Sequence, residues 1–334
     1  MLNILKFGFD LDGGWLSPRF HIESARVAER LGYDSVWMGD HFLPWFHSEA
    51  QAPAVWPWLG VALAETERIK IGPSVAIPIG GRYHPLIVGQ YAATLDNMFP
   101  GRFMLGVGTG QAMSEYRFLG RWPNWKERGE RLREGLELIR KLWESEDYFD
   151  WNGKYFTTSK VYLYTRPEGK IPIVVSARGK YAARIAGELG DHLITTVSNT
   201  DKIRNEILPA FENAMRKTGK DPSKAMKIGS FEFAIGNVDD LVRMLRGSTA
   251  AMGLIEAARD EMDPRKIQEL SSHVPLQEII AHHHLVSKPD ELVEPIQNLV
   301  DAGLNYIILA DEGRDPNNSM KMLMETVLPQ VKAS

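Results

Sequence analysis

Short runs of strand-forming residues alternate with longer amphipathic runs eight times along the 334-residue chain, and this repeat restricts the possible folds more than any other feature. Several of the short runs are apolar nearly throughout, as strands are when both faces of a parallel sheet are covered. Eight strands, each followed by a helix, predict a (β/α)8 barrel of the TIM type. The predicted strands are residues 5–11, 35–40, 69–77, 102–108, 171–177, 192–197, 227–235 and 306–311.

The first predicted helix has clear end signals. Ser17 stands at the N-cap, Pro18 at the first helical position and Gly32 at the C-terminal end. A doubly wound open sheet is the alternative fold, but the loop after the first strand has no G-x-G-x-x-G spacing, which favours the barrel. Further amphipathic helices are predicted over residues 84–98, 124–146, 179–190, 201–219 and 319–331.

Two intervals are too long to be simple connections. Residues 145–170 contain Asn152-Gly153, a pair typical of a hairpin turn, and residues 237–305 are predicted to be largely helical. No linker or low-complexity segment divides the chain. We therefore expect a single barrel domain over residues 1–334 with these two insertions.

Composition excludes several classes of protein. There is no cysteine, which excludes disulfides, thiolate nucleophiles and Cys-type metal centres. The net charge is −4 without a Lys/Arg-rich run, so nucleic acid and anionic membranes are not expected partners. The N-terminus turns acidic too early for a signal peptide, and no apolar run approaches the ~20 residues of a membrane span. We expect a soluble, cytoplasmic protein that binds a small molecule.

The active site of such a barrel lies where strands end and helices begin. The stretch "WMGDHFLPWFH" (37–47) places Asp40, His41 and Trp45 at the end of the second strand. The other strand ends supply Asp10, Asp12, Ser74, Val75, "GVGTGQAMSE" (106–115), "SARGK" (176–180), Thr195, Thr196, Ser198, Glu232 and Asp311.

These residues favour a large planar ligand with an anionic tail over a hydrolytic site. No nucleophile elbow or metal-ligand spacing is present, and Asp10 and Asp12 share one face of a strand, which is poor geometry for bracketing a bond. The exposed amides of "GTGQ" and "ARGK", at helix starts, suit a phosphate, and Arg178 and Lys180 add positive charge.

Each residue also has a purely structural interpretation. A glycine-rich strand-to-helix turn is commonly only a turn, and a His beside an Asp commonly caps a helix or bonds within a core. Trp45 alone is more typical of packing. The three consecutive histidines at 282–284 point in different directions on a helix, so they cannot converge on one ion, and no metal site is expected.

Longer segments resemble the deazaflavin (coenzyme F420)-dependent dehydrogenases of the luciferase-like (β/α)8 group, above all their glucose-6-phosphate and secondary-alcohol dehydrogenases. The combination of "DHF-x-PW" with "GVGTG" at this separation is specific, and the similarity covers nearly the whole chain. The segments are "GDHFLPW" (39–45), "SVAIP" (74–78), and residues 83–115, 122–144 and 187–196.

The resemblance implies a barrel that commonly dimerises and holds the deazaflavin in its mouth. It implies that Asp40 meets the cofactor ring, and that Ser74-Val75 forms a bulge behind the ring, often with a non-proline cis peptide. His41 would be the general base toward an alcohol, and the Trp45 N–H would bond the nascent oxyanion. The other cofactor-binding residues implied are Ile77, Thr109, Gly110, Ser114, Ala177, Arg178, Gly179, Lys180, Thr195 and Thr196.

The chain departs from that family at positions that matter for the substrate. Gln111, which we count with the catalytic residues, replaces a Glu, and a first-loop Glu aligns near Gly14. Asp12, Glu115 and Glu232 are the candidates to replace them. The cations that bind substrate phosphate in the sugar-phosphate enzyme align with Asn199, Glu269 and His282, so charge-assisted bonds are lost.

The predicted function is therefore hydride transfer between F420 and a neutral alcohol or carbonyl compound rather than glucose 6-phosphate. Three alternatives stay open. One is a reductase of an activated double bond or nitroaromatic that uses reduced F420. Another is an FMN-dependent monooxygenase of the same fold, and the third is a non-catalytic, cofactor-binding relative.

Overall fold

The computed structural model describes residues 5–11, 14–197, 199–246 and 260–333. Two residues that the sequence places at strand ends, Asp12 and Ser198, lie outside the described residues. Among the helices of the described part of the chain, none combines the length and apolar character needed to cross a membrane.

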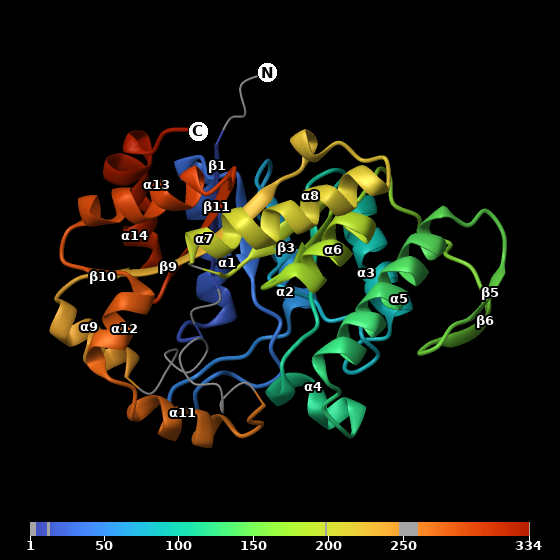
Figure 1. Ribbon diagram of the computed structural model, residues 1–334, viewed down its shortest axis with the longest axis horizontal. Coiled ribbons are helices and arrows are strands. Elements are labelled where there is room, and N and C mark those ends of the chain that lie inside the picture. The colour runs from blue at the N-terminus through green and yellow to red at the C-terminus, as the bar shows by residue number, and fades with distance from the viewer. Residues whose placement is uncertain (1–4, 12–13, 198, 247–259, 334) are drawn as a thin grey trace.

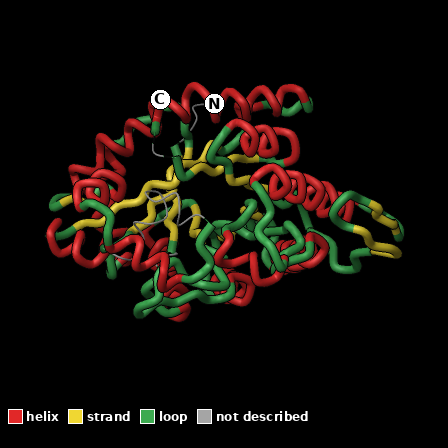
Figure 2. The backbone as a smooth tube through the Cα atoms, turned by 60° about the horizontal axis from the view of Figure 1, so that its bottom comes forward, coloured by secondary structure: helices red, strands yellow, loops and turns green. Residues whose placement is uncertain are grey.

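All eight predicted strands are present and form a nearly closed parallel barrel with helices around it (Figures 1 and 2). The strand order is β3-β2-β1-β11-β9-β8-β7-β4, and isolated parallel bridges Ile71–Phe103 and Ala76–Val107 join the two ends of this order. The (β/α)8 prediction is therefore confirmed. The strands are β1 Lys6–Asp10, β2 Ser35–Met38, β3 Lys70–Pro73, β4 Leu105–Val107, β7 Ile173–Ser176, β8 His192–Thr195, β9 Lys227–Ile235 and β11 Tyr306–Asp311.

The first helix starts and stops where the sequence signals predict, whereas α2 and α4 were not predicted and α14 begins earlier than expected, at Pro316. Ser17 Oγ accepts a hydrogen bond from Phe20 N, and Gly32 adopts φ +90° after the last turn of the first helix. The α-helices are α1 Pro18–Leu31, α2 Val55–Ala64, α3 Pro85–Met98, α4 Ala112–Leu119, α5 Trp125–Glu144, α6 Lys180–Leu189, α7 Thr200–Lys202, α8 Leu208–Lys217, α9 Val238–Leu245, α11 Pro264–Ser272, α12 Leu276–His283, α13 Val293–Asp301 and α14 Pro316–Met322.

Two predicted helices are not regular, and a proline explains both. A π-helical turn, Ile203–Ile207, separates α7 from α8 directly before Leu208-Pro209. A second, Leu323–Val327, follows α14 directly before Leu328-Pro329. Because proline has no N–H and its ring clashes with the carbonyl four residues earlier, the preceding turn widens to bonds between residues five apart.

Both insertions have the predicted character. The hairpin of β5 Phe149–Asn152 and β6 Thr157–Val161 projects from the side of the molecule beyond α5 (Figure 1). The described part of the second interval is mostly helical, with α9, α11, α12 and α13. Its short strand β10 Leu285–Val286 pairs with β9 at the rim of the barrel.

Side-chain alternation fixes which residues face the barrel interior. One buried cluster, which fills the interior, consists of Trp37, Met104, Val174, Ile194, Ile228, Tyr306 and Ile308. Along β11 the interior residues are therefore even-numbered, so Ala310 faces inward and Asp311 outward. Glu232 on β9 is paired in register with Ala310 and faces inward with it, nearer the carboxyl ends of the strands.

Candidate active site

Asp40, expected beside the cofactor ring, is buried against Arg82. Arg82 Nη2 lies 3.0 Å from Asp40 Oδ2 and also donates to the Asp40 carbonyl oxygen. The Tyr83 hydroxyl donates to Asp40 Oδ1 at 3.4 Å. The same arginine faces Glu115, whose Oε2 accepts from Arg82 N at 3.0 Å and whose Oε1 lies 3.8 Å from Arg82 Nε. We call Asp40, Arg82 and Glu115 the arginine cluster.

The arginine cluster buries two acids around one cation. Burial raises the pKa of Asp40, and the neighbouring Arg82 and His41 charges act in the opposite direction. Burial also raises the pKa of Glu115, while the Arg82 N–H and charge lower it. Glu115 is fully buried and committed to Arg82. The Arg82 guanidinium therefore holds Asp40, the residue directly before His41.

Sequence reasoning missed Arg82. It lies in "PIGGRYHP" (78–85), the loop that follows the third strand. A single arginine in a glycine-rich loop at a strand end was the available signal, but its two partners are 42 and 33 residues away in the chain.

His41 and Trp45 lie side by side. Their ring centroids are 5.8 Å apart at an interplanar angle of 66°. Trp45 packs against Met113 and Ile267. Its Nε1 is buried and has no hydrogen-bond acceptor among the described residues. Since buried N–H groups are nearly always paired in folded proteins, this donor is available to a bound oxygen.

The start of α4 supports the His41 turn. Ser114 is buried, and its Oγ accepts a hydrogen bond from Phe42 N at 3.2 Å. Gln111 is the N-cap residue of α4, but its side chain makes no capping bond. Ser114 therefore has an observed role in holding the chain beside His41, whereas the Gln111 side chain has none at the helix end.

The ends of β3 and β4 approach each other closely through glycines. A Cβ built on Gly108 would lie 2.7 Å from Val75 Cγ2, and one on Gly110, at φ +75°, would lie 2.8 Å from Ile77 Cγ2. The Ser74–Val75 peptide bond is cis, as the resemblance predicted. Thr109, between the two glycines, is half-buried.

The residues after β7 and β8 form an open edge. Ala177 is buried, whereas Arg178 and Lys180 are exposed, and Lys180 Nζ lies 3.7 Å from Glu206 Oε2. A Cβ on Gly179, the N-cap of α6, would meet no heavy atom within 4 Å. Thr195, the last residue of β8, is buried and its Oγ1 accepts from Val197 N, while Thr196 is exposed.

Residues 6–306 match the model of the luciferase-like monooxygenase family. The chain belongs to this luciferase-like family. The F420-dependent glucose-6-phosphate dehydrogenase of Microbacterium testaceum is 34% identical over 332 residues, which cover 98% of each chain. The enzyme of the same name from Rhodococcus erythropolis is 34% identical and covers 100% of this chain and 99% of its own.

A solved structure also resembles this chain. An F420-dependent secondary alcohol dehydrogenase in complex with an F420-acetone adduct superimposes with a TM-score of 0.92 and 33% identity. It covers 98% of this chain and 99% of its own. The predicted membership of the luciferase-like group is therefore confirmed.

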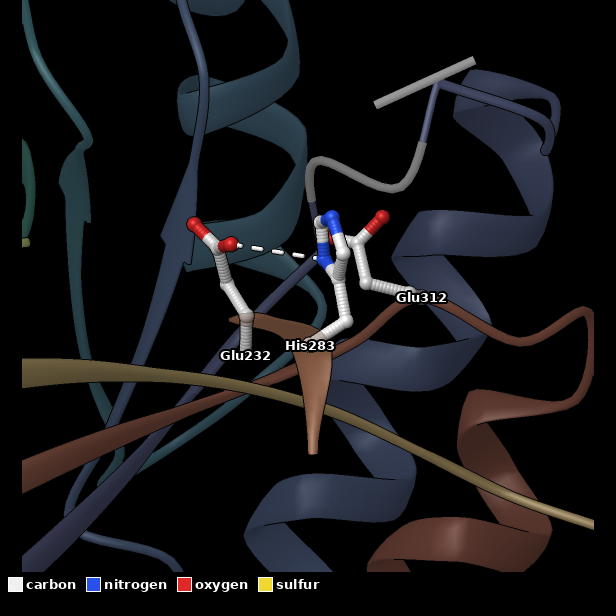
Figure 3. Close-up of side chains that lie close together, drawn as sticks. All are labelled: Glu232, His283 and Glu312. Atoms are coloured by element: carbon white, nitrogen blue, oxygen red, sulfur yellow. Dashed lines mark ion pairs between the residues drawn. The ribbon is translucent and has the colours of Figure 1, made fainter. Parts of the chain in front are cut away.

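This luciferase-like barrel has a second group of ionisable residues, the histidine cluster, formed by the half-buried Glu232 and the buried His283 and Glu312 (Figure 3). His283 Nδ1 lies 3.6 Å from Glu232 Oε2, and His282 Nε2 lies 4.0 Å from the same oxygen. Burial raises the pKa of Glu232 and lowers that of His283 to about 3.

Of the three consecutive histidines, His282 and His283 both face Glu232, whereas His284 has a different neighbour. The His282 and His283 rings are inclined at 82°, and His284 instead stacks on Phe231 at 4.5 Å between ring centroids. The sequence did not predict a role for Glu312, because the predicted strand 306–311 ends at Asp311, one residue earlier. The barrel register turns Asp311 outward, where its Oδ1 accepts from Gly313 N at 2.8 Å.

A cavity of about 450 Å³ lies outside the site described above. It separates the turn after His41 from the start of α11 and is lined by Leu43, Pro44, His47, Arg117 and residues 261–266. None of the predicted site residues lines it, so it does not alter the assignment of the barrel mouth.

Proposed function

We propose that this chain transfers hydride between coenzyme F420 and a small neutral alcohol or its carbonyl product. The chain is an F420-dependent oxidoreductase, as its 34% identical relatives and its structural neighbour are named. The observation that carries the alcohol assignment is the buried Trp45 N–H, which has no acceptor among the described residues and lies next to His41.

The residues present fit the cofactor. Gly108 and Gly110 keep the space next to Val75 and Ile77 free of a side chain that would collide there. The open N-terminus of α6, with exposed Arg178 and Lys180, suits an anionic tail. The deazaflavin supplies a ring carbon that accepts or returns hydride. The residues that would hold it are Asp40, Ser74, Val75, Ile77, Thr109, Gly110, Ser114, Ala177, Arg178, Gly179, Lys180, Thr195 and Thr196.

His41 and Trp45 would manage the substrate oxygen. His41 takes the hydroxyl proton during oxidation and returns it during reduction, a task that suits imidazole because it ordinarily titrates near neutrality. Trp45 Nε1–H donates to the same oxygen and holds it while its charge changes. The arginine cluster fixes the backbone that carries His41.

The substrate side lacks the features of a phosphate site. Asn199, one of the positions that align with a phosphate-binding cation, uses its Oδ1 to cap α7 by accepting from Lys202 N at 2.9 Å. At a second such position His282 supplies an imidazole in place of a permanently charged side chain, and its Nε2 lies 4.0 Å from Glu232 Oε2. A neutral alcohol needs no Lys or Arg at these positions, which is why we propose it over glucose 6-phosphate.

The test is a fluorescence titration of the full chain with F420, with FMN as the parallel control, followed by turnover assays. Micromolar or tighter F420 binding, no FMN binding, and faster turnover of secondary alcohols than of glucose 6-phosphate support the proposal. Binding of FMN alone would overturn the cofactor assignment. Preferred turnover of glucose 6-phosphate would overturn the substrate assignment.

A further inference from the structure

We propose that Glu232, His283 and Glu312 form a binding site for one divalent transition-metal ion at the mouth of the barrel. The three residues come from separate elements: Glu232 from β9, His283 from the last turn of α12, and Glu312 from the residue after β11. One donor atom from each lies within 4.8 Å of the others. The tertiary fold alone brings them together.

The strand register places both carboxylates on the same face. Glu232 pairs with Ala310, and the ladder continues by one bond, from Glu312 N to Phe233 O at 2.8 Å. Because alternate residues share a face, Glu312 lies on the inward side, one step beyond Ala310. Figure 3 shows the Glu232 carboxylate directed at the His283 ring and the Glu312 carboxylate beside the same ring.

His283 gives the second, independent indication. Its side chain is 1% exposed, and neither ring nitrogen makes a hydrogen bond within the described chain. The 3.6 Å from His283 Nδ1 to Glu232 Oε2 is too long for a hydrogen bond. It is close to the ~3.4 Å that separates two ligands each about 2.1 Å from one tetrahedral ion. A bound ion would satisfy a buried nitrogen that is otherwise costly to leave without a partner.

The donor set indicates the kind of ion. One imidazole and two carboxylates suit Zn²⁺, Mn²⁺ or Fe²⁺, whereas Ca²⁺ and Mg²⁺ prefer oxygen alone. The Glu232 side chain is 24% exposed, so an ion can reach the site from solvent. The sequence argument against a metal site was that three consecutive histidines cannot converge on one ion, and it does not apply to this site because only His283 is proposed as a ligand.

The test titrates the full chain with Zn²⁺ and, separately, Mn²⁺ by calorimetry after chelator treatment and dialysis. We expect one ion per chain with a dissociation constant below about 10 μM for at least one metal. His283→Ala and Glu312→Gln should each weaken binding at least tenfold. His273→Ala is the matched control, because this exposed histidine lies in the same helical interval but outside the cluster. The affinity of this variant for the metal ion should stay within threefold of the wild-type value.

A folding check separates loss of the site from loss of the protein. Each variant must keep the wild-type thermal unfolding temperature within a few degrees; if His283→Ala does not, His283→Gln and Glu232→Gln replace it. F420 affinity, measured by fluorescence, should not change, so this result is independent of the cofactor proposal. Absence of stoichiometric binding, or equal affinity in wild type and in the folded His283 and Glu312 variants, would overturn the metal site.

Discussion

The arginine cluster and the histidine cluster both bring two carboxylates close together, but they do so around different basic groups. Each gathers two carboxylates and one basic group at the carboxyl ends of the strands, and in each the burial of a carboxylate raises its pKa. In the first, the Arg82 guanidinium lies 3.0 Å from the Asp40 carboxylate and 3.8 Å from that of Glu115, which also accepts a hydrogen bond from Arg82 N. In the second, burial lowers the pKa of His283 to about 3 and its ring donates to neither acid.

The difference shows what a buried acid pair needs. A guanidinium carries a fixed charge, so in the arginine cluster both carboxylates face a cation, although Asp40 Oδ2, Arg82 Nε and Glu115 Oε1 make no hydrogen bond among the described residues. A neutral imidazole offers one donor and no charge, so it cannot balance two carboxylates. The first cluster therefore serves to position its neighbours, and the second has the composition of a ligand site.

The largest expected effect concerns the residue that the arginine cluster positions. His41→Ala should lower turnover by roughly 10²–10⁴-fold, the usual contribution of a general base, and leave F420 affinity nearly unchanged. Steady-state kinetics and a fluorescence titration measure the two quantities. His47→Ala, in the same loop but exposed, is the control. Wild-type turnover in His41→Ala would remove this residue from the mechanism.

The next largest effect is expected on the stability of the fold, when the arginine cluster is disrupted. Arg82→Met leaves two buried acids without their cation, so we expect the free energy of unfolding to fall by about 3–5 kcal/mol. Chemical denaturation measures this loss. Arg26→Met removes an exposed arginine that also contacts two acids, Glu23 and Glu65, and should lower the stability much less, because solvent screens this ion pair. Similar losses in both variants would contradict the distinction.

His192, on strand β8 of the barrel, is a second histidine whose pKa is lowered by burial, and it can be compared with His283. Burial lowers the pKa of His192 to about 4, and its Nδ1 accepts from Met226 N at 3.1 Å. Because the folded-state pKa lies below the unfolded value of 6.5, protonation favours unfolding. The stability from the neutral ring is complete above pH 6.5 and is lost as the pH falls toward 4, by about 3 kcal/mol.

Denaturation at several pH values tests this slope. His192→Asn keeps an acceptor for Met226 N but cannot be protonated, so its stability should fall less between pH 6.5 and 4 than that of the wild type. Parallel curves for the two proteins would show that other groups carry the acid sensitivity.

The smallest effect is expected at Gln111. Gln111→Glu places an acid at the N-cap of α4, where the present side chain makes no capping bond, and should stabilise the fold by about 0.3–1 kcal/mol. It should also shift substrate preference toward that of the alcohol dehydrogenases, measured as relative kcat/KM for a panel of alcohols. Destabilisation without a change in preference would give Gln111 a structural role instead.

Local chemistry made much of the molecule predictable. The alternation of short strand-forming runs with longer amphipathic runs predicted the eight strands. Ser17 and Gly32 predicted the ends of α1, and Asn152-Gly153 predicted the hairpin. The π-helical turns were missed, although Pro209 and Pro329 were visible, because the sequence does not show whether a helix ends or widens at a proline. Here packing on both sides of the proline keeps the chain helical.

The sequence by itself determined the barrel, the family and the stretch that carries Asp40, His41 and Trp45, because these depend on periodicity and on local motifs. Only the tertiary structure decided that Arg82 joins Asp40 to Glu115, and that Glu232, His283 and Glu312 meet. Such pairings depend on strand register and on which residues of distant loops face inward. A shift of one residue would have turned Asp311 inward and Glu312 outward, and no local pattern around either residue reveals that choice.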